Sequence, residues 1–377
     1  MMPTQRRYHV DVVSIPFLAI RDLRRGFRRF VLLGVVVALV ALLSTVLSAL
    51  STGLVTDGIS GLRALPARQL AFEPGAKATF SRSTLDEADL RAFSGMDGVE
   101  ATALGASFVN AASTSGGPSL DLALFGVAAD SFLVTRDDAR AALSGEPGLV
   151  LARELADEGV KVGDRYEVGG SDVELPVLGF TFAGTYGHAP IAFVSLATWQ
   201  KIQYGDQPRG RFSAVALRGD SKAIERAGSK AGLDVLTKTA AYAGSPGYSA
   251  ETTTMTLIRT FLLVISALVV GAFFTVLTVQ RTRQIGLLKA MGATNGYIAR
   301  DSVGQMTILV AVATAVGVAV GVGVVVLLGG GDAPVELAPG SIATVAISLV
   351  ASGVVGSLAA IRRITQVEPA IALGVEP

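Results

Sequence analysis

Residues 30–56 read FVLLGVVVALVALLSTVLSALSTGLVT and contain no Asp, Glu, Lys or Arg. An α-helix rises about 1.5 Å per residue, so a helix of this length can cross a hydrocarbon core of roughly 30 Å. Three later stretches are equally free of charge, at residues 260–280, 302–331 and 337–361. The sequence therefore predicts four transmembrane helices.

The charged residues between these stretches are separated by sign. Residues 57–259 contain 24 acidic and 19 basic residues, a net charge of −5 (19 − 24). The remaining 13 Lys and Arg (32 − 19) all lie before the first stretch, between the second and third, or after the fourth. Because cytoplasmic segments of membrane proteins collect Lys and Arg, we expect a multi-pass protein of the cell membrane with both termini in the cytoplasm.

This topology divides the chain into successive segments. We expect transmembrane helices over residues 30–56, 255–280, 302–331 and 337–361, an extracytoplasmic domain over 57–254, an outer turn over 332–336, and cytoplasmic segments over 1–29, 281–301 and 362–377. Within the first segment, apolar and Arg residues alternate at helical spacing, which favours an amphipathic elbow helix lying on the membrane surface. A simple orientation signal for the first span is the alternative interpretation.

The 57–254 segment does not have the composition of a membrane span. It contains no cysteine, so it is expected to fold without disulfides. Thr84 and Glu87 fit a capping box that would open a short helix. Further candidate elements are strands at 148–152, 173–185, 212–217 and 233–237 and a helix at 222–231. The predicted fold class is a polytopic α-helical membrane protein with four transmembrane helices and an α+β extracytoplasmic domain between the first and second.

Sequence motifs of several enzyme classes are absent. There is no GxxxxGK[ST] loop, so we do not expect this chain to hydrolyse ATP itself. Two histidines and no cysteine argue against a structural zinc site. His188 is the only histidine in the extracytoplasmic segment, and without a GxSxG motif we expect it to be a partly exposed loop residue. We expect no enzyme, no catalytic cofactor or metal, and no nucleic-acid partner.

Small residues recur every four positions in three of the predicted spans. The rows are Gly317 and Gly321, then Ser348, Ser352, Gly356 and Ala360, and finally Ser44 and Ser48. Small residues let helix backbones approach closely in lipid, so these rows predict packed helix faces. No charged residue lies deep in any span, which argues against a proton-relay carrier. The energy for any transport is therefore expected to enter from the cytoplasmic side.

The cytoplasmic loop carries the most distinctive motif, RTRQIGLLKAMGAT at residues 281–294. Ile285, Leu288 and Met291 form an apolar ridge bordered by basic residues, which suits docking in a groove of a soluble partner. An interfacial helix that touches only lipid is the alternative interpretation.

This motif resembles the hallmark of the FtsX/MacB superfamily of ABC transporter permeases, R-x-R-E-I-G-L-L-R-A-L-G-A. Gln284 replaces the usual Glu of that pattern and Lys289 replaces an Arg. The C-terminal VEPAIALGVEP is similar to the P-x-x-A-L-R close of the superfamily, with Gly374 in place of Arg. GLVLARELADEGVKVGD at residues 148–164 resembles its extracytoplasmic domain. By length and compact insert, the chain looks most like the HrtB-type heme exporter permeases.

The resemblance implies a permease homodimer, or a pair of related permeases, that binds two copies of a separate ABC ATPase subunit. ATP and Mg would then be bound by that subunit. The coupling residues implied by the motif are Arg281, Arg283, Gln284, Ile285, Gly286, Leu287, Leu288, Lys289, Ala290, Met291 and Gly292. The expected activity is expulsion of a hydrophobic or amphipathic substrate from the outer leaflet.

Heme is the first substrate hypothesis. Glu251, Met255 and Arg259 are spaced four residues apart and share one helix face at the outer end of the second span. Met or Glu could bind heme iron and Arg259 could pair with a propionate. Tyr248 and Arg63 are expected at the same level. Alternatively, Arg259 reaches head groups and Met255 only packs.

Two other hypotheses stay open at this point. The cargo could be a lipoprotein, peptide or drug. The chain could also move nothing and act as an FtsX-like mechanotransmitter that regulates an extracytoplasmic partner.

Overall fold

The computed structural model describes residues 27–114, 116–207, 210–280, 286–287, 289, 291–329 and 333–365. The chain forms two compact units, one of Met1–Gly53 with Thr254–Pro377 and one of Leu54–Thr253. The elbow helix predicted within residues 1–29 lies almost wholly outside the described residues.

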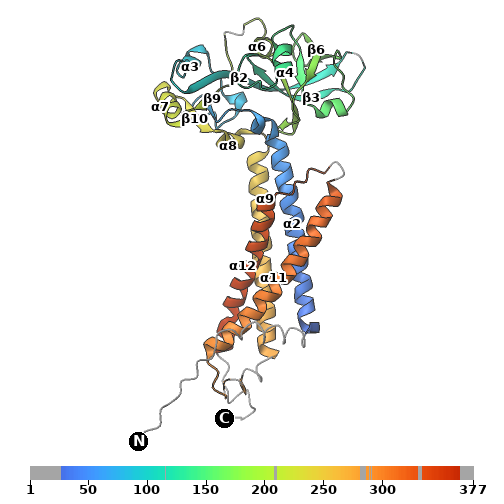
Figure 1. The fold of residues 1–377 in the computed structure, drawn as a ribbon, viewed down its shortest axis with the longest axis vertical. Helices are drawn as coiled ribbons and strands as arrows, with labels where there is room; N and C mark the ends of the chain where they lie inside the picture. Colours follow the sequence, from blue (N-terminus) through green and yellow to red (C-terminus); the bar gives the residue numbers. More distant parts are fainter. Residues whose placement is uncertain are drawn as a thin grey trace. The chain divides into compact units, whose positions relative to one another are not determined.

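Four long helices account for the first unit (Figure 1). They are α2 (Phe27–Ala64), α9 (Tyr248–Gln280), α11 (Asn295–Leu328) and α12 (Pro339–Thr365). Each is long and apolar enough to cross a membrane, judged by length and composition. The predicted fold class is confirmed: a membrane protein with four membrane-capable helices and a mixed helix–strand unit between the first and second. The helices α2 and α9 have their outer ends within the second unit.

Three glycines of the predicted rows, Gly317, Gly321 and Gly356, lie where helices meet. A Cβ added at Gly317 of α11 would collide with the carbonyl oxygen of Ala38 in α2, and one at Gly321 would lie 2.9 Å from Thr45. In α12, Gly356 sits against the backbone of Ala267 in α9. Backbones can approach this closely only because no side chain separates them. Their apolar surroundings include the buried residues Leu33, Val37, Val270, Phe274, Met306 and Val310.

The Leu54–Thr253 unit is built on a ten-stranded mixed sheet. Its strands are β1 (Gln69–Phe72), β2 (Val99–Ser113), β3 (Leu120–Val127), β4 (Leu149–Leu151), β5 (Arg165–Val168), β6 (Val173–Phe180), β7 (Thr185–Tyr186), β8 (Ala189–Ser195), β9 (Ala214–Gly219) and β10 (Asp234–Thr237). The order is β10-β1-β9-β2-β3-β8-β4-β6-β5, with β7 paired to β8. Only β3–β8 and β4–β6 are parallel among the pairs of the described strands.

Short helices connect these strands. They are η2 (Phe80–Arg82), α3 (Glu87–Arg91), α4 (Asp137–Leu143), α5 (Glu154–Asp157), α6 (Leu196–Tyr204), α7 (Ser221–Ala231), α8 (Lys238–Ala241) and η3 (Tyr242–Gly244). Side chains of successive strand residues point to opposite faces, so the sheet has a core on each side. In β8, Ile191 and Phe193 belong to one core, and Ala192 and Val194 belong to the other.

The predicted capping box at Thr84 and Glu87 is wrong by two residues. Helix α3 begins at Glu87, and Asp86 is its N-cap, whose Oδ1 accepts a hydrogen bond from Ala88 N at 2.7 Å. The chain is still extended before this point, because Leu85 forms a β-bridge with Phe212. The predicted strand 173–185 is also too long, since β6 ends at Phe180 and the chain pairs again only at β7.

Candidate functional site

A tight hairpin between β7 and β8 places the one histidine of the outer unit. Tyr186 pairs with Ala189, so the connecting turn consists of Gly187 and His188. Both turn residues have positive φ, 57° for Gly187 and 65° for His188. Two successive positive φ values are the geometry of a type I′ turn, whose twist matches that of the flanking strands. The turn therefore fixes the direction in which the imidazole projects.

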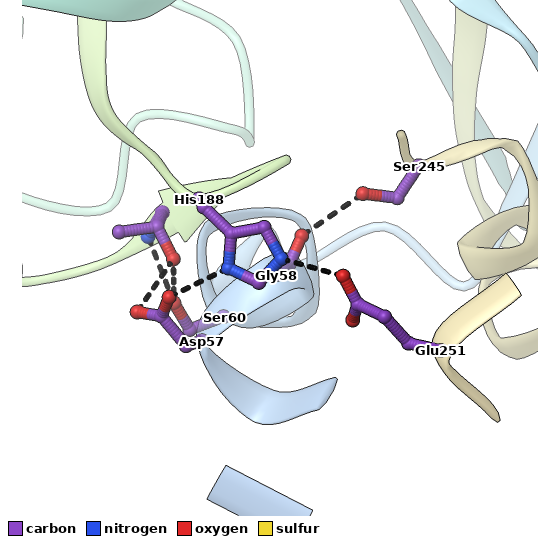
Figure 2. Close-up of polar contacts among 7 residues, drawn as sticks. Asp57, Gly58, Ser60, His188, Ser245 and Glu251 are labelled. Carbon is purple, nitrogen blue, oxygen red and sulfur yellow. Dashed lines mark hydrogen bonds and ion pairs between the residues drawn. The ribbon is translucent and has the colours of Figure 1, made fainter. Parts of the chain in front are cut away.

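His188 joins the outer ends of α2 and α9 through two carboxylates (Figure 2). Its Nδ1 lies 2.8 Å from Asp57 Oδ2, and its Nε2 lies 3.0 Å from Glu251 Oε1. An ionised carboxylate only accepts hydrogen bonds, so both ring nitrogens donate when both acids are charged. The hydrogen bond that His188 donates to Asp57 and the weaker effect of the one to Glu251 raise the pKa of His188, although its partial burial acts in the opposite direction. The geometry therefore favours the imidazolium form.

Further hydrogen bonds, from backbone and from serine side chains, attach the hairpin to α2. Gly187 N donates to Gly58 O at 2.9 Å, and Thr185 N donates to Ser60 Oγ at 2.8 Å. Ser245 Oγ also donates to Gly58 O at 2.9 Å, which ties the segment before α9 to the same turn of α2 (Figure 2). A Cβ added at Gly58 would lie 3.4 Å from His188 Cε1. The cluster of Asp57, His188 and Glu251 thus links α2 to α9 through the β7–β8 hairpin by charged hydrogen bonds.

Sequence reasoning missed this cluster. It predicted His188 to be a partly exposed loop residue, and the side chain is 34% exposed, but its pairing with two acids was not foreseen. A usable signal was present, since Asp57 is the first acid after the first uncharged stretch and Glu251 is the last before the second. Among the described residues, no group of three or more His, Cys, Asp or Glu has an arrangement that could hold a metal ion.

The residues predicted to bind substrate have different surroundings. Tyr248 packs on Tyr242, with ring centroids 6.3 Å apart. Arg63 is exposed at the end of α2, where its carbonyl oxygen accepts a hydrogen bond from Lys238 Nζ at 2.8 Å. The carboxylate of Glu251 accepts a hydrogen bond from His188. In the part of the chain that the structure describes, these three outer-unit residues thus each have a different contact partner.

Met255 and Arg259 belong to the helical unit. Met255 is half-buried. Arg259 turns toward α2, where its Nη2 donates to Ser48 O at 3.3 Å and to Ser48 Oγ at 3.2 Å. A cavity of about 320 Å³ opens beside it. Its lining residues are Ser44, Ser48, Arg259, Leu263, Gly340, Ser341, Thr344, Val345, Ser348 and Leu349.

The predicted coupling loop is described only in part. Gly286, Leu287 and Lys289 are helical, and Met291 and Gly292 form the turn that follows. Leu287 is 53% exposed and Met291 is 69% exposed, so two apolar side chains of this loop are available to a partner. The remaining predicted coupling residues lie outside the described residues, namely Arg281, Arg283, Gln284, Ile285, Leu288 and Ala290.

Three curated relatives match parts of this chain. Two are from strains of Staphylococcus epidermidis, are 26% identical over 44% of this chain and 45% of their own length, and are named as hemin transport system permease protein HrtB. The third, from Staphylococcus haemolyticus and named likewise, is 23% identical over 60% of this chain and 63% of its own length. The chain therefore spans about half the length of the first curated relatives it matches.

Comparison of structures and of family models adds two findings. The outer domain of an ABC-type transporter named YknZ, from Gram-positive bacteria, aligns with 45% of this chain and 98% of that domain, at 15% identity and a TM-score of 0.33. Residues 256–369 match the FtsX-like permease C-terminal family. The resemblance predicted from the cytoplasmic loop is thus confirmed: residues 256–369 match the FtsX-like permease C-terminal family, and parts of the chain are similar to permeases of the HrtB kind.

Proposed function

We propose that this chain is the permease subunit of an ABC exporter driven by a separate ATPase subunit. The observation that carries the proposal is the FtsX-like permease match over residues 256–369, which includes most of α9, the loop after it, α11 and α12. The chain has no GxxxxGK[ST] motif of its own, so a partner would supply ATP hydrolysis. Two such ATPases would act on a permease homodimer, with both chain termini in the cytoplasm.

The cytoplasmic loop is the proposed contact with the ATPase. Leu287 and Met291 expose apolar surface there, and Lys289 adds a positive charge between them. Apolar anchors flanked by charge are what a groove on a soluble partner recognises. Movement of this loop would be transmitted through α9 and α11, which begin or end within a few residues of it.

The proposed cargo is a hydrophobic or amphipathic molecule taken from the outer leaflet, with heme as the first candidate. The names of the relatives support heme, and the spacing of Glu251, Met255 and Arg259 along α9 is compatible with it. Glu251 is hydrogen-bonded to His188, so iron binding by Glu251 would require that bond to open. Among the hydrogen bonds of the described residues none engages the side chain of the half-buried Met255, which makes it the simpler iron ligand.

Co-purification and ATPase activity test this proposal. Leu287→Asp places a charge on the exposed ridge and is expected to abolish co-purification of the full chain with a co-expressed ABC ATPase. Asn295→Asp, at an exposed position at the start of α11, adds the same charge outside the ridge and should leave the complex intact.

Hemin should then stimulate ATP hydrolysis by the reconstituted complex. Retention of the ATPase by Leu287→Asp would overturn the assigned docking surface. A complex whose ATPase ignores hemin would remove heme as cargo and favour force transmission to an outer partner.

A further inference from the structure

Arg259 is a cation in an apolar helix, and no residue that the structure describes gives it an acidic partner. Its two hydrogen bonds go to Ser48 of α2, one to the carbonyl oxygen and one to the hydroxyl group, and both are neutral. Its Nε is buried and makes no hydrogen bond. Within the described part of the chain, no carboxylate forms an ion pair with Arg259. Charged side chains at such positions usually pair with an opposite charge, so the neutral surroundings of Arg259 require an explanation.

The cavity beside Arg259 has the lining that an anion needs. Arg259 is the only charged residue among those that line it, and five of the others carry hydroxyl groups, namely Ser44, Ser48, Ser341, Thr344 and Ser348. A guanidinium group presents several N–H donors in one plane, and serine hydroxyl groups can donate to the same oxyanion. Thr344 Oγ1 donates to Gly340 O at 2.8 Å, so the serines are the hydroxyl donors to consider. Leu263, Val345 and Leu349 supply the apolar part of the lining.

The size of the cavity limits what it can hold. Its volume of about 320 Å³ lies at the lower end of the range for small-molecule sites, roughly 300–1,000 Å³. It therefore suits the acidic end of an amphiphile, with the apolar body lying outside. Gly340 contributes to this space, because a Cβ added there would meet no protein atom within 4 Å.

A simple orientation of Arg259 toward water does not account for these contacts. A side chain that only reaches the membrane surface keeps its guanidinium group in water or among head groups. Here the guanidinium contacts the backbone of a neighbouring helix and its Nε is shielded from solvent.

We propose that the Arg259 cavity is an oxyanion subsite that binds the carboxylate or phosphate of an amphiphile. The inference deepens the proposed export function and rests on it for the identity of the amphiphile as cargo. With this subsite, the permease would bind acidic amphiphiles more tightly than neutral ones of equal size. An acidic cargo and an acidic lipid head group share this chemistry, and the experiment distinguishes them.

The test measures binding to the full-length chain in lipid nanodiscs, without an ATPase. Hemin, which has two free carboxylates, is compared with its dimethyl ester, which has none. Wild type should bind hemin about tenfold more tightly than the ester, as expected for one charge-assisted hydrogen-bonded pair. Arg259→Gln should lower hemin affinity about tenfold and leave ester affinity within twofold. Arg259→Lys should retain part of the preference. Arg226→Gln removes an exposed Arg of α7, away from every residue predicted to bind substrate, and should change neither affinity.

A second variant keeps the test independent of the charge change. Gly340→Leu adds a side chain at a residue that lines the cavity and has room for a Cβ, and it should lower hemin affinity while Arg259 stays in place. A parallel experiment addresses lipid binding. Native mass spectrometry compares how much phosphatidylglycerol and how much phosphatidylcholine remain bound to wild type and to Arg259→Gln. Loss of phosphatidylglycerol in Arg259→Gln, with equal binding of hemin and ester by wild type, would assign the oxyanion to lipid. Equal loss of hemin and ester, or no change in either arm, would overturn the subsite.

The exporter proposal and the oxyanion-subsite proposal can be refuted independently of each other. If the acid preference is present but no ATPase co-purifies with the chain, the subsite stands and the exporter proposal falls. If an ATPase couples to the chain but Arg259→Gln leaves both arms unchanged, the exporter proposal stands and the subsite falls.

Discussion

At the scale of single residues, the two hydrogen bonds of His188 depend on its protonation state. Its two ring nitrogens face two carboxylate acceptors, so both bonds exist together only when the ring carries two protons. The neutral ring has a single N–H and must give up one acceptor. The connection between Asp57 and Glu251 is therefore complete only in the imidazolium form.

This leads to a pH-dependent contribution to stability. Because the pKa of His188 is raised in the folded state, its stabilisation is fully present below the unfolded pKa of about 6.5 and is lost as pH rises through the folded value. We expect His188→Gln to be less stable than wild type by about 1 kcal/mol at pH 5.5, a small effect since the side chain is 34% exposed. The difference should shrink above the raised pKa.

Melting temperatures of the purified chain across pH 5.5 to 9 would measure this. His9→Gln serves as control, because it removes the other histidine of the chain. A stability difference that is constant across this range, or that grows with pH, would contradict the imidazolium assignment.

At the scale of helices, glycine rows determine how closely neighbours pack. Gly317 and Gly323 lie on the same helix, α11, but have different environments. A Cβ at Gly317 would collide with the backbone of Ala38, whereas one at Gly323 would meet nothing within 4 Å. Both positions are helical, so an alanine at either site gains the same intrinsic helix propensity, up to about 1 kcal/mol.

The pair therefore isolates the cost of the contact. We expect Gly317→Ala to destabilise the chain by about 1–3 kcal/mol through overpacking against α2, and Gly323→Ala to be neutral or slightly stabilising. Thermal unfolding in detergent, followed by loss of monodisperse protein, would measure both. Equal melting temperatures for the two variants would show that α2 and α11 are not packed along this row.

The sequence predicted helices better than it predicted the sheet and the polar cluster. Freedom from charge over twenty or more residues is a local property, so the four helices could be found directly. Strand order and the partners of His188 depend on contacts between residues far apart in sequence, which periodicity does not report. The misplaced cap has the same origin, because the bridge from Leu85 to Phe212 keeps the chain extended past Thr84.

At the scale of the whole molecule, the opposing charges of its segments are the basis of the orientation that we expect in the membrane. The net charge is only +1, yet the segment from 57 to 259 is net negative and the rest is net positive. A positive excess near helix ends holds them on the cytoplasmic side. The proposed ATPase contact at Leu287 and Met291 and the proposed cytoplasmic position of the termini both depend on this orientation.

The absence of cysteine makes the orientation directly testable, since any engineered thiol is the only one in the chain. Ser229 and Met291 are both exposed, one in α7 of the outer unit and one in the loop before α11. We expect a membrane-impermeant maleimide to label Ser229→Cys in intact cells and to label Met291→Cys only after the membrane is permeabilised. Labelling both in denaturant confirms that each thiol is reactive. If Met291→Cys reacts in intact cells as fast as Ser229→Cys, the two segments share one side of the membrane, and an ATPase in the cytoplasm could not reach the proposed ridge.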